Sequence, residues 1–165
     1  MRIEETGLST WLRESPSVWA FPTVLALHTL GLGLVVGGSS ILSLRILGSA
    51  SRMPLQPLEK LFPIIWFGFT VNAVSGVLLL MKAATTAGIS VLFWTKIAII
   101  VVAMIVVVRM KTTVFGGTDA GTRPISGSAK ALALASIVLW TAAIIAGRLL
   151  AYVGPTQAES SVIFG

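Results

Sequence analysis

Four long apolar stretches, separated by short polar segments, divide this chain. The first, from Val18 to Leu44, contains no Asp, Glu, Lys or Arg. About 20 consecutive apolar residues are enough to cross the hydrocarbon core of a bilayer. The pattern therefore predicts an all-α integral membrane protein, a four-helix bundle that forms one transmembrane domain over residues 1–165. Its helices are expected at about 17–45, 61–81, 91–109 and 130–153.

Composition agrees with this fold class. The chain is 55% hydrophobic and only 11% charged, whereas a soluble domain carries about 25% charged residues. The net charge of +6 does not indicate nucleic-acid binding, because the cationic residues stand at the ends of apolar stretches instead of forming a patch. Cysteine is absent, which excludes disulfides, thiolate metal sites and a cysteine nucleophile.

The distribution of positive charge predicts an orientation in a bacterial inner membrane. Seven cationic residues lie between helices one and two or between helices three and four: Arg45, Arg52, Lys60, Arg109, Lys111, Arg123 and Lys130. The positive-inside rule places both segments in the cytoplasm and both termini on the periplasmic side. Residues 1–15 are predicted to form a short amphipathic segment in the membrane interface, anchored by Trp11. The alternative for this segment is a frayed tail.

Small residues predict where the helices pack. Gly33 and Gly37 form a GxxxG pair, which we interpret as a packing site, with dimerisation as the alternative. The second apolar stretch carries a stripe of small and polar residues at helical spacing: Gly68, Asn72, Ser75, Gly76 and Leu79. This stripe should face the bundle, because Asn72 would cost several kcal/mol against hydrocarbon.

Candidate chemistry centres on His28, the only histidine. It lies ten residues into the first apolar stretch, which is about 15 Å deep at ~1.5 Å per residue, and an ionisable group there is a functional-site hypothesis by default. Asn72, Lys96 and Arg148 are expected in the same periplasmic half, each on a different helix. Helical spacing also predicts that Trp140 and Arg148 both point inward from the fourth helix.

These residues outline a pocket that takes an acidic ligand. An imidazole supplies a metal ligand or a proton acceptor, and two cations bind acidic groups. A b-type haem fits, with His28 as the metal ligand and the propionates at Lys96 and Arg148. A quinone or an anionic lipid fits as well. In the alternative interpretation, Lys96 and Arg148 reach toward the headgroups, and His28 only forms a hydrogen bond to Asn72 or a backbone carbonyl.

The sequence does not favour an enzyme. It contains no Walker motif, HExxH pair, GxSxG motif or carboxylate pair. The predicted spans also lack acidic residues, which argues against a proton pump or a cation transporter.

Three short segments carry a resemblance to known proteins: Ala26-Leu27-His28-Thr29-Leu30-Gly31, Phe93-Trp94-Thr95-Lys96, and Ala146-Gly147-Arg148-Leu149-Leu150-Ala151-Tyr152. The chain resembles a group of small bacterial four-helix membrane proteins, which is similar to copper-resistance-D-like and b-type-cytochrome-like bundles. The resemblance implies that His28, Lys96 and Arg148 share a site. Bundles that hold haem between two histidines need a second one, so here a bis-His haem would require a second subunit.

The expected function is therefore a multi-pass inner-membrane subunit or a small electron-transfer module that binds b-type haem or quinone through His28. Its expected partners are the lipid bilayer and either further copies of the chain or other membrane subunits. The alternative is a structural or lipid-binding subunit of a larger membrane complex, without a cofactor.

Overall fold

The computed structural model describes residues 20–82, 91–117 and 124–163. These residues form four long helices and one short 3₁₀ helix: α2 (Ala20–Leu47), η2 (Gln56–Lys60), α3 (Leu61–Lys82), α5 (Val91–Phe115) and α6 (Gly127–Ile163). The described residues contain no strand, which confirms the all-α prediction. The expected amphipathic segment with Trp11 lies outside the described residues.

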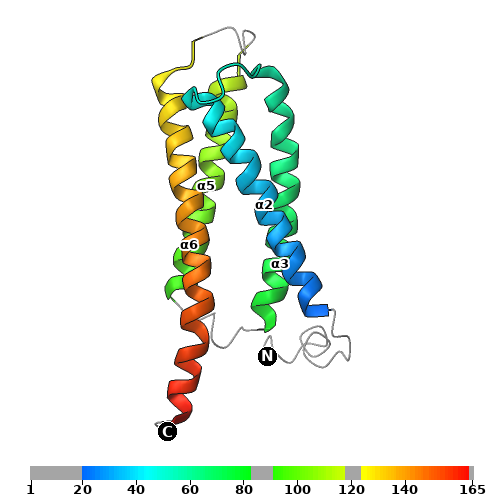
Figure 1. The fold of residues 1–165 in the computed structure, drawn as a ribbon, viewed down its shortest axis with the longest axis vertical. Helices are drawn as coiled ribbons and strands as arrows, with labels where there is room; N and C mark the ends of the chain where they lie inside the picture. Colours follow the sequence, from blue (N-terminus) through cyan, green and yellow to red (C-terminus); the bar gives the residue numbers. More distant parts are fainter. Residues whose placement is uncertain (1–19, 83–90, 118–123, 164–165) are drawn as a thin grey trace.

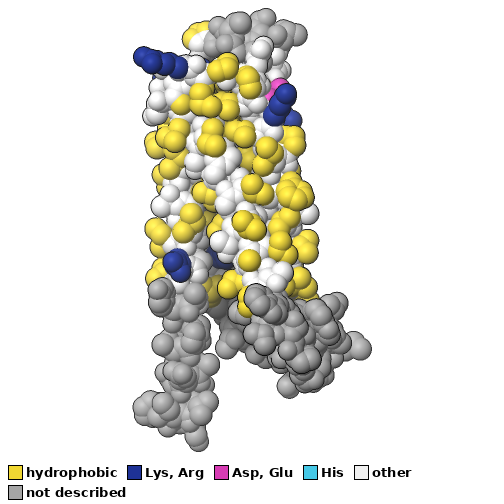
Figure 2. Space-filling view, turned by 45° about the vertical axis from the view of Figure 1, so that its right-hand side comes forward, with side chains coloured by type: hydrophobic (Ala, Val, Ile, Leu, Met, Phe, Trp, Pro, Cys, Tyr) yellow, Lys and Arg dark blue, Asp and Glu magenta, His cyan; other side chains and the backbone are white. Residues whose placement is uncertain are grey.

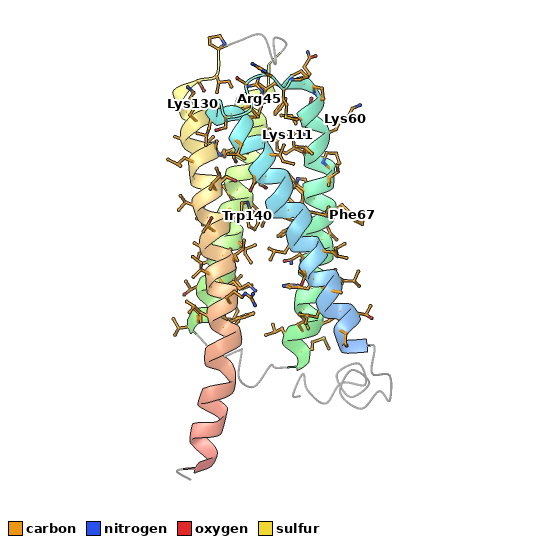
Figure 3. The ribbon with its side chains drawn as sticks, in the orientation of Figure 1. Arg45, Lys60, Phe67, Lys111, Lys130 and Trp140 are labelled. Carbon is orange, nitrogen blue, oxygen red and sulfur yellow. The ribbon has the colours of Figure 1, made fainter. Side chains whose placement is uncertain are left out.

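The helices form two antiparallel pairs (Figure 1). α2 packs along α3, and α5 packs along α6; α2 also packs against α6 and so joins the two pairs. α2 and α5 end at the end of the bundle where α3 and α6 begin (Figure 1). We call this the basic end, because Arg45, Lys60, Lys111 and Lys130 all lie there (Figure 3).

All four long helices are apolar enough to cross a membrane. The candidate spans are Pro22–Leu47, Gln56–Met81, Val91–Phe115 and Gly127–Leu150. Large apolar side chains cover the outside of the bundle, and Phe67 and Trp94 are 64% and 60% exposed. Figure 2 shows hydrophobic side chains along the described surface, with Lys and Arg near its two ends. Such a surface suits contact with lipid.

The end of α2 is defined by a glycine cap. Gly48 has a φ of +98°, a conformation that costs glycine little because it has no Cβ. Its N–H donates to the Arg45 carbonyl at 3.2 Å, and the Ser49 N–H donates to the Leu44 carbonyl at 3.1 Å. This is the Schellman pattern. It ends α2 at Leu47, two residues beyond the predicted end.

The other boundaries also differ from the sequence-based prediction. α5 continues to Phe115 instead of ending near residue 109. α6 begins at Gly127 instead of residue 130, because the Ser126 hydroxyl caps it by accepting the Ala129 N–H at 3.2 Å. The prediction that the last helix ends near residue 153 was wrong, since α6 continues through Pro155 to Ile163. A proline removes one helical hydrogen bond and can be passed where the flanking turns remain helical.

α2 and α3 approach each other closely at two glycines. A Cβ added to Gly31 would lie 2.7 Å from the Asn72 backbone nitrogen and 2.8 Å from the Gly68 carbonyl oxygen. A Cβ on Gly68 would lie 2.7 Å from the Leu34 Cβ. Gly68 is buried and Ser75 is 3% exposed, so the predicted inward orientation of this stripe is confirmed.

The prediction that Gly33 and Gly37 form a packing site was wrong within the described residues. A Cβ at either glycine would have no heavy atom within 4 Å. The glycines of α2 that contact α3 are Gly31 and Gly38. Gly31 lies two residues before Gly33 and hence about 200° around the helix, and Gly38 lies one residue after Gly37 and hence about 100° around it. The same spacing that makes a GxxxG pair does not reveal which side of the helix meets a neighbour.

Four polar side chains are buried in the interior without a hydrogen-bond partner among the described residues. Ser39 and Ser43 lie one turn apart on α2, and Ser136 and Trp140 lie one turn apart on α6. The three serines have no exposed surface, and Trp140 is 3% exposed. An unpaired buried polar group costs roughly 1–3 kcal/mol, so these side chains lower the stability of the bundle.

Ser136→Ala is therefore expected to leave the free energy of unfolding unchanged or to raise it by about 1 kcal/mol. Ser75→Ala is the matched control, because the Ser75 hydroxyl donates to the Val71 carbonyl at 2.6 Å and its loss should be destabilising. Denaturant unfolding of both variants in detergent measures the difference. A larger loss for Ser136→Ala than for Ser75→Ala would show that Ser136 is hydrogen-bonded in solution.

Candidate functional site

α2 places the half-buried His28 ring against α3, at the end of the bundle away from the basic end. Its Nδ1 lies 3.0 Å from the Asn72 carbonyl oxygen and 3.1 Å from the Ser75 hydroxyl oxygen. The Ser75 hydroxyl donates its own proton to the Val71 carbonyl at 2.6 Å. We therefore assign the imidazole proton to Nδ1, which donates to both oxygens, and Nε2 keeps its lone pair.

Asn72 completes a reciprocal contact between the two helices. Its side-chain amide donates to the His28 carbonyl oxygen at 2.8 Å, while the His28 ring donates to the Asn72 carbonyl. Each side chain thus bonds to the backbone of the other residue, which sets the register of α2 against α3. The interhelical hydrogen bond proposed for His28 as an alternative is confirmed for Nδ1, and Nε2 has no partner among the described residues.

Gly76 provides the space that the ring occupies. A Cβ at this position would lie 3.2 Å from His28 Cε1 and 3.6 Å from Nδ1. The first distance is tighter than ordinary van der Waals contact, so any larger residue would press on the ring. Asn72, Ser75 and Gly76 together therefore fix both the position and the tautomer of His28. A histidine that binds a metal usually donates its other ring N–H to a carbonyl or carboxylate in this manner.

Lys96 brings a cation to the same end of the bundle from the other helix pair. It lies seven residues before the fully buried Ala103 on α5, so the two share the inward face of the helix. Its stem crosses α6 at Gly147, where an added Cβ would lie 3.5 Å from both Lys96 Cε and Nζ. Lys96 is half-buried. It stands near the start of α5, at the same end of the bundle as His28 near the start of α2.

No ion pair or hydrogen bond engages the Lys96 ammonium within the part of the chain that the structure describes. No acidic residue occurs in residues 20–47, 61–82 or 91–115, so α2, α3 and α5 offer it no carboxylate. A half-buried cation in apolar surroundings is costly unless it meets an opposite charge. The site thus combines one imidazole acceptor and one cation that is available to an acidic or carbonyl oxygen.

The prediction that Arg148 points inward with Trp140 was wrong. Arg148 is exposed, and Ile144, one turn before it on α6, is 41% exposed. The inward face of α6 instead contains Trp140 and Gly147, which are seven residues apart and hence nearly two full turns. Arg148 is one residue further and is rotated by about 100°. It lies beside the Lys96 contact but faces away from the interior.

Trp140 lies in the core and not beside His28. It is 3% exposed and belongs to the main apolar cluster with Val35 and Ala103. Along α6 it is about 10 Å from Gly147, at ~1.5 Å per residue. The structure therefore brings His28 and Asn72 into contact and places Lys96 at the same end of the bundle, while Trp140 lies in the core and Arg148 faces away from the interior.

Sequence reasoning did not assign site roles to Ser75 and Gly147. Ser75 was placed on a packing stripe, yet its hydroxyl accepts from the His28 ring. Gly147 lies beside the Lys96 side chain, where an added Cβ would meet Cε and Nζ at 3.5 Å, an ordinary van der Waals distance. In both cases the available signal was a small residue at the depth of a polar residue on another helix.

No group of three or more potential metal ligands occurs among the described residues, so His28 would be a single protein ligand.

Comparisons with family models, with curated proteins and with solved structures found no match for this chain. Its function therefore has to be inferred from the chemistry of the site.

Proposed function

We propose that this chain is a multi-pass membrane protein that acts as a small electron-transfer module and binds a redox cofactor, b-type haem or a quinol, at His28. The observation that carries the proposal is the fixed imidazole: Nδ1–H is held by the Asn72 carbonyl and the Ser75 hydroxyl, and Nε2 is left as an acceptor. A bound haem or quinol would supply the electron transfer, because no side chain near His28 is redox-active.

The residues present fit either cofactor. Nε2 would hold a haem iron or accept a hydrogen bond from the hydroxyl of a quinol. Lys96, which has no acidic partner in the described part, supplies a cation for a propionate or for the second quinone oxygen. Asn72 and Gly76 hold the ring in place for this contact. With one histidine in the chain, a second axial haem ligand would come from a partner subunit.

The positions of the cationic residues support an orientation for this module. Arg45, Lys60, Lys111 and Lys130 lie at one end (Figure 3), which we assign to the cytoplasmic face of a bacterial inner membrane by the positive-inside rule. The His28 site then lies in the periplasmic half. An electron carrier in the periplasm or in the bilayer would reach the site from that side.

The absorption spectrum of the protein, purified in mild detergent from bacterial membranes, tests this function. A haem gives a Soret band that shifts on reduction. A quinone is detected by solvent extraction and should be present at about one per chain. The absence of both would overturn the proposal and favour the alternative, a structural subunit in which His28 only joins α2 to α3.

A further inference from the structure

α3 and α5 leave an apolar groove between them on the outside of the bundle. The groove encloses about 310 Å³ and is lined by Trp66 and Phe69 from α3 and by residues of α5 from Val101 to Arg109. Its length along α5 is roughly 12 Å at ~1.5 Å per residue. It is separate from the His28 site, which lies where α2 meets α3.

The groove ends toward the basic end in a cluster of aromatic and cationic side chains. The Phe62 and Phe115 rings pack edge to face, with centroids 5.7 Å apart, and the Lys111 ammonium lies 5.5 Å from the Phe62 ring centroid. These contacts close the space between α3 and α5 at their basic ends. Beyond them the two helices make little direct contact, and the groove opens.

Arg109 is the one charged side chain that lines the groove. It is exposed and forms no hydrogen bond or ion pair within the described ranges. Lys60 and Lys111 lie at the same end (Figure 3). Glu59 is the only acidic residue in residues 20–82 and 91–117. An anion at this end of the groove would thus meet a guanidinium in surroundings of net positive charge.

We propose that the α3–α5 groove binds one anionic phospholipid of the surrounding bilayer. One acyl chain fills the apolar groove against Trp66 and Phe69, and the phosphate accepts hydrogen bonds from the Arg109 guanidinium, which can bind it with two N–H groups. The Arg109 guanidinium, at the end of the groove, selects an anionic headgroup over a zwitterionic one. The proposal rests on the proposed membrane location but not on the cofactor at His28.

Native mass spectrometry of the purified protein with added dioleoyl phosphatidylglycerol or dioleoyl phosphatidylcholine tests this site. The wild-type chain should bind phosphatidylglycerol about ten-fold more tightly, which corresponds to about 1.4 kcal/mol. Arg109→Gln should remove this preference. Lys130→Gln is the matched control, because Lys130 lies at the same end on α6 and does not line the groove; it should keep the preference.

Ile105→Trp tests the apolar part of the site. Ile105 lines the groove and is 54% exposed, so a larger side chain can fill the groove without entering the core. Binding of both lipids should fall at least ten-fold, with an unchanged helical circular dichroism spectrum. Equal binding of the two lipids by the wild-type chain, or an Arg109→Gln variant that keeps its preference, would overturn the proposal. Loss of the cofactor spectrum alone would leave it intact.

Discussion

Replacement of Gly31 or Gly68 by alanine is expected to destabilise the bundle by about 2–4 kcal/mol. The added Cβ would lie 2.7 Å from the backbone nitrogen of Asn72 or from the Cβ of Leu34, and backbone cannot move away without separating the helices. Overpacking of this kind costs about 1–3 kcal/mol. Separation would also stretch the His28–Asn72 hydrogen bonds, each worth about 0.5–1.5 kcal/mol.

The matched controls are Gly33→Ala and Gly37→Ala on the same helix. A Cβ at either position meets nothing within 4 Å, so these variants should be neutral or slightly more stable, because alanine favours helix over glycine by about 1 kcal/mol. Thermal unfolding of all four variants in one detergent measures the contrast. If the Gly33→Ala and Gly37→Ala variants lost more stability than the Gly31→Ala and Gly68→Ala variants, Gly33 and Gly37 would form an interface with another chain.

His28→Ala is expected to remove the proposed cofactor completely, because the chain has no other imidazole. The Soret band or the extracted quinone should be absent from the purified variant, which should still fold. If the cofactor is haem, added imidazole should restore part of the band by replacing the missing ligand. Thr29→Ala is the control, because Thr29 is exposed and its hydroxyl donates to the Leu25 carbonyl of its own helix. That variant should keep the full cofactor content.

Two further variants should give graded losses at the same site. Ser75→Ala removes one of the two acceptors that hold Nδ1–H, and loss of such an orienting contact lowers affinity about 10- to 100-fold at metal sites. Lys96→Gln removes a charge-assisted contact worth about 1.5–3 kcal/mol, a factor of about ten or more in cofactor affinity. A His28→Ala protein with a full cofactor complement would contradict the assignment of His28, whatever Ser75→Ala and Lys96→Gln show.

The sequence by itself determined the four apolar spans and their approximate positions. Hydropathy is a local property that adds up along the chain, so a stretch such as Val91 to Val108 can be assigned without knowledge of its neighbours. The inward orientation of Asn72 also followed, because a polar amide has few acceptable surroundings in an apolar helix. The pairing of His28 with α3 was open to the same reasoning and was stated as one of two alternatives.

Only the tertiary structure decided which side of each helix meets which neighbour. Each residue advances by about 100° around the helix axis, so a difference of one or two positions separates Gly31 from Gly33 and Gly147 from Arg148. The tertiary structure also determined that the proton of His28 is on Nδ1, because the tautomer depends on where the Asn72 carbonyl and the Ser75 hydroxyl lie. The α3–α5 groove exists because α3 packs against α2 and α5 packs against α6, so that α3 and α5 make little contact with each other. No local sequence pattern encodes that arrangement.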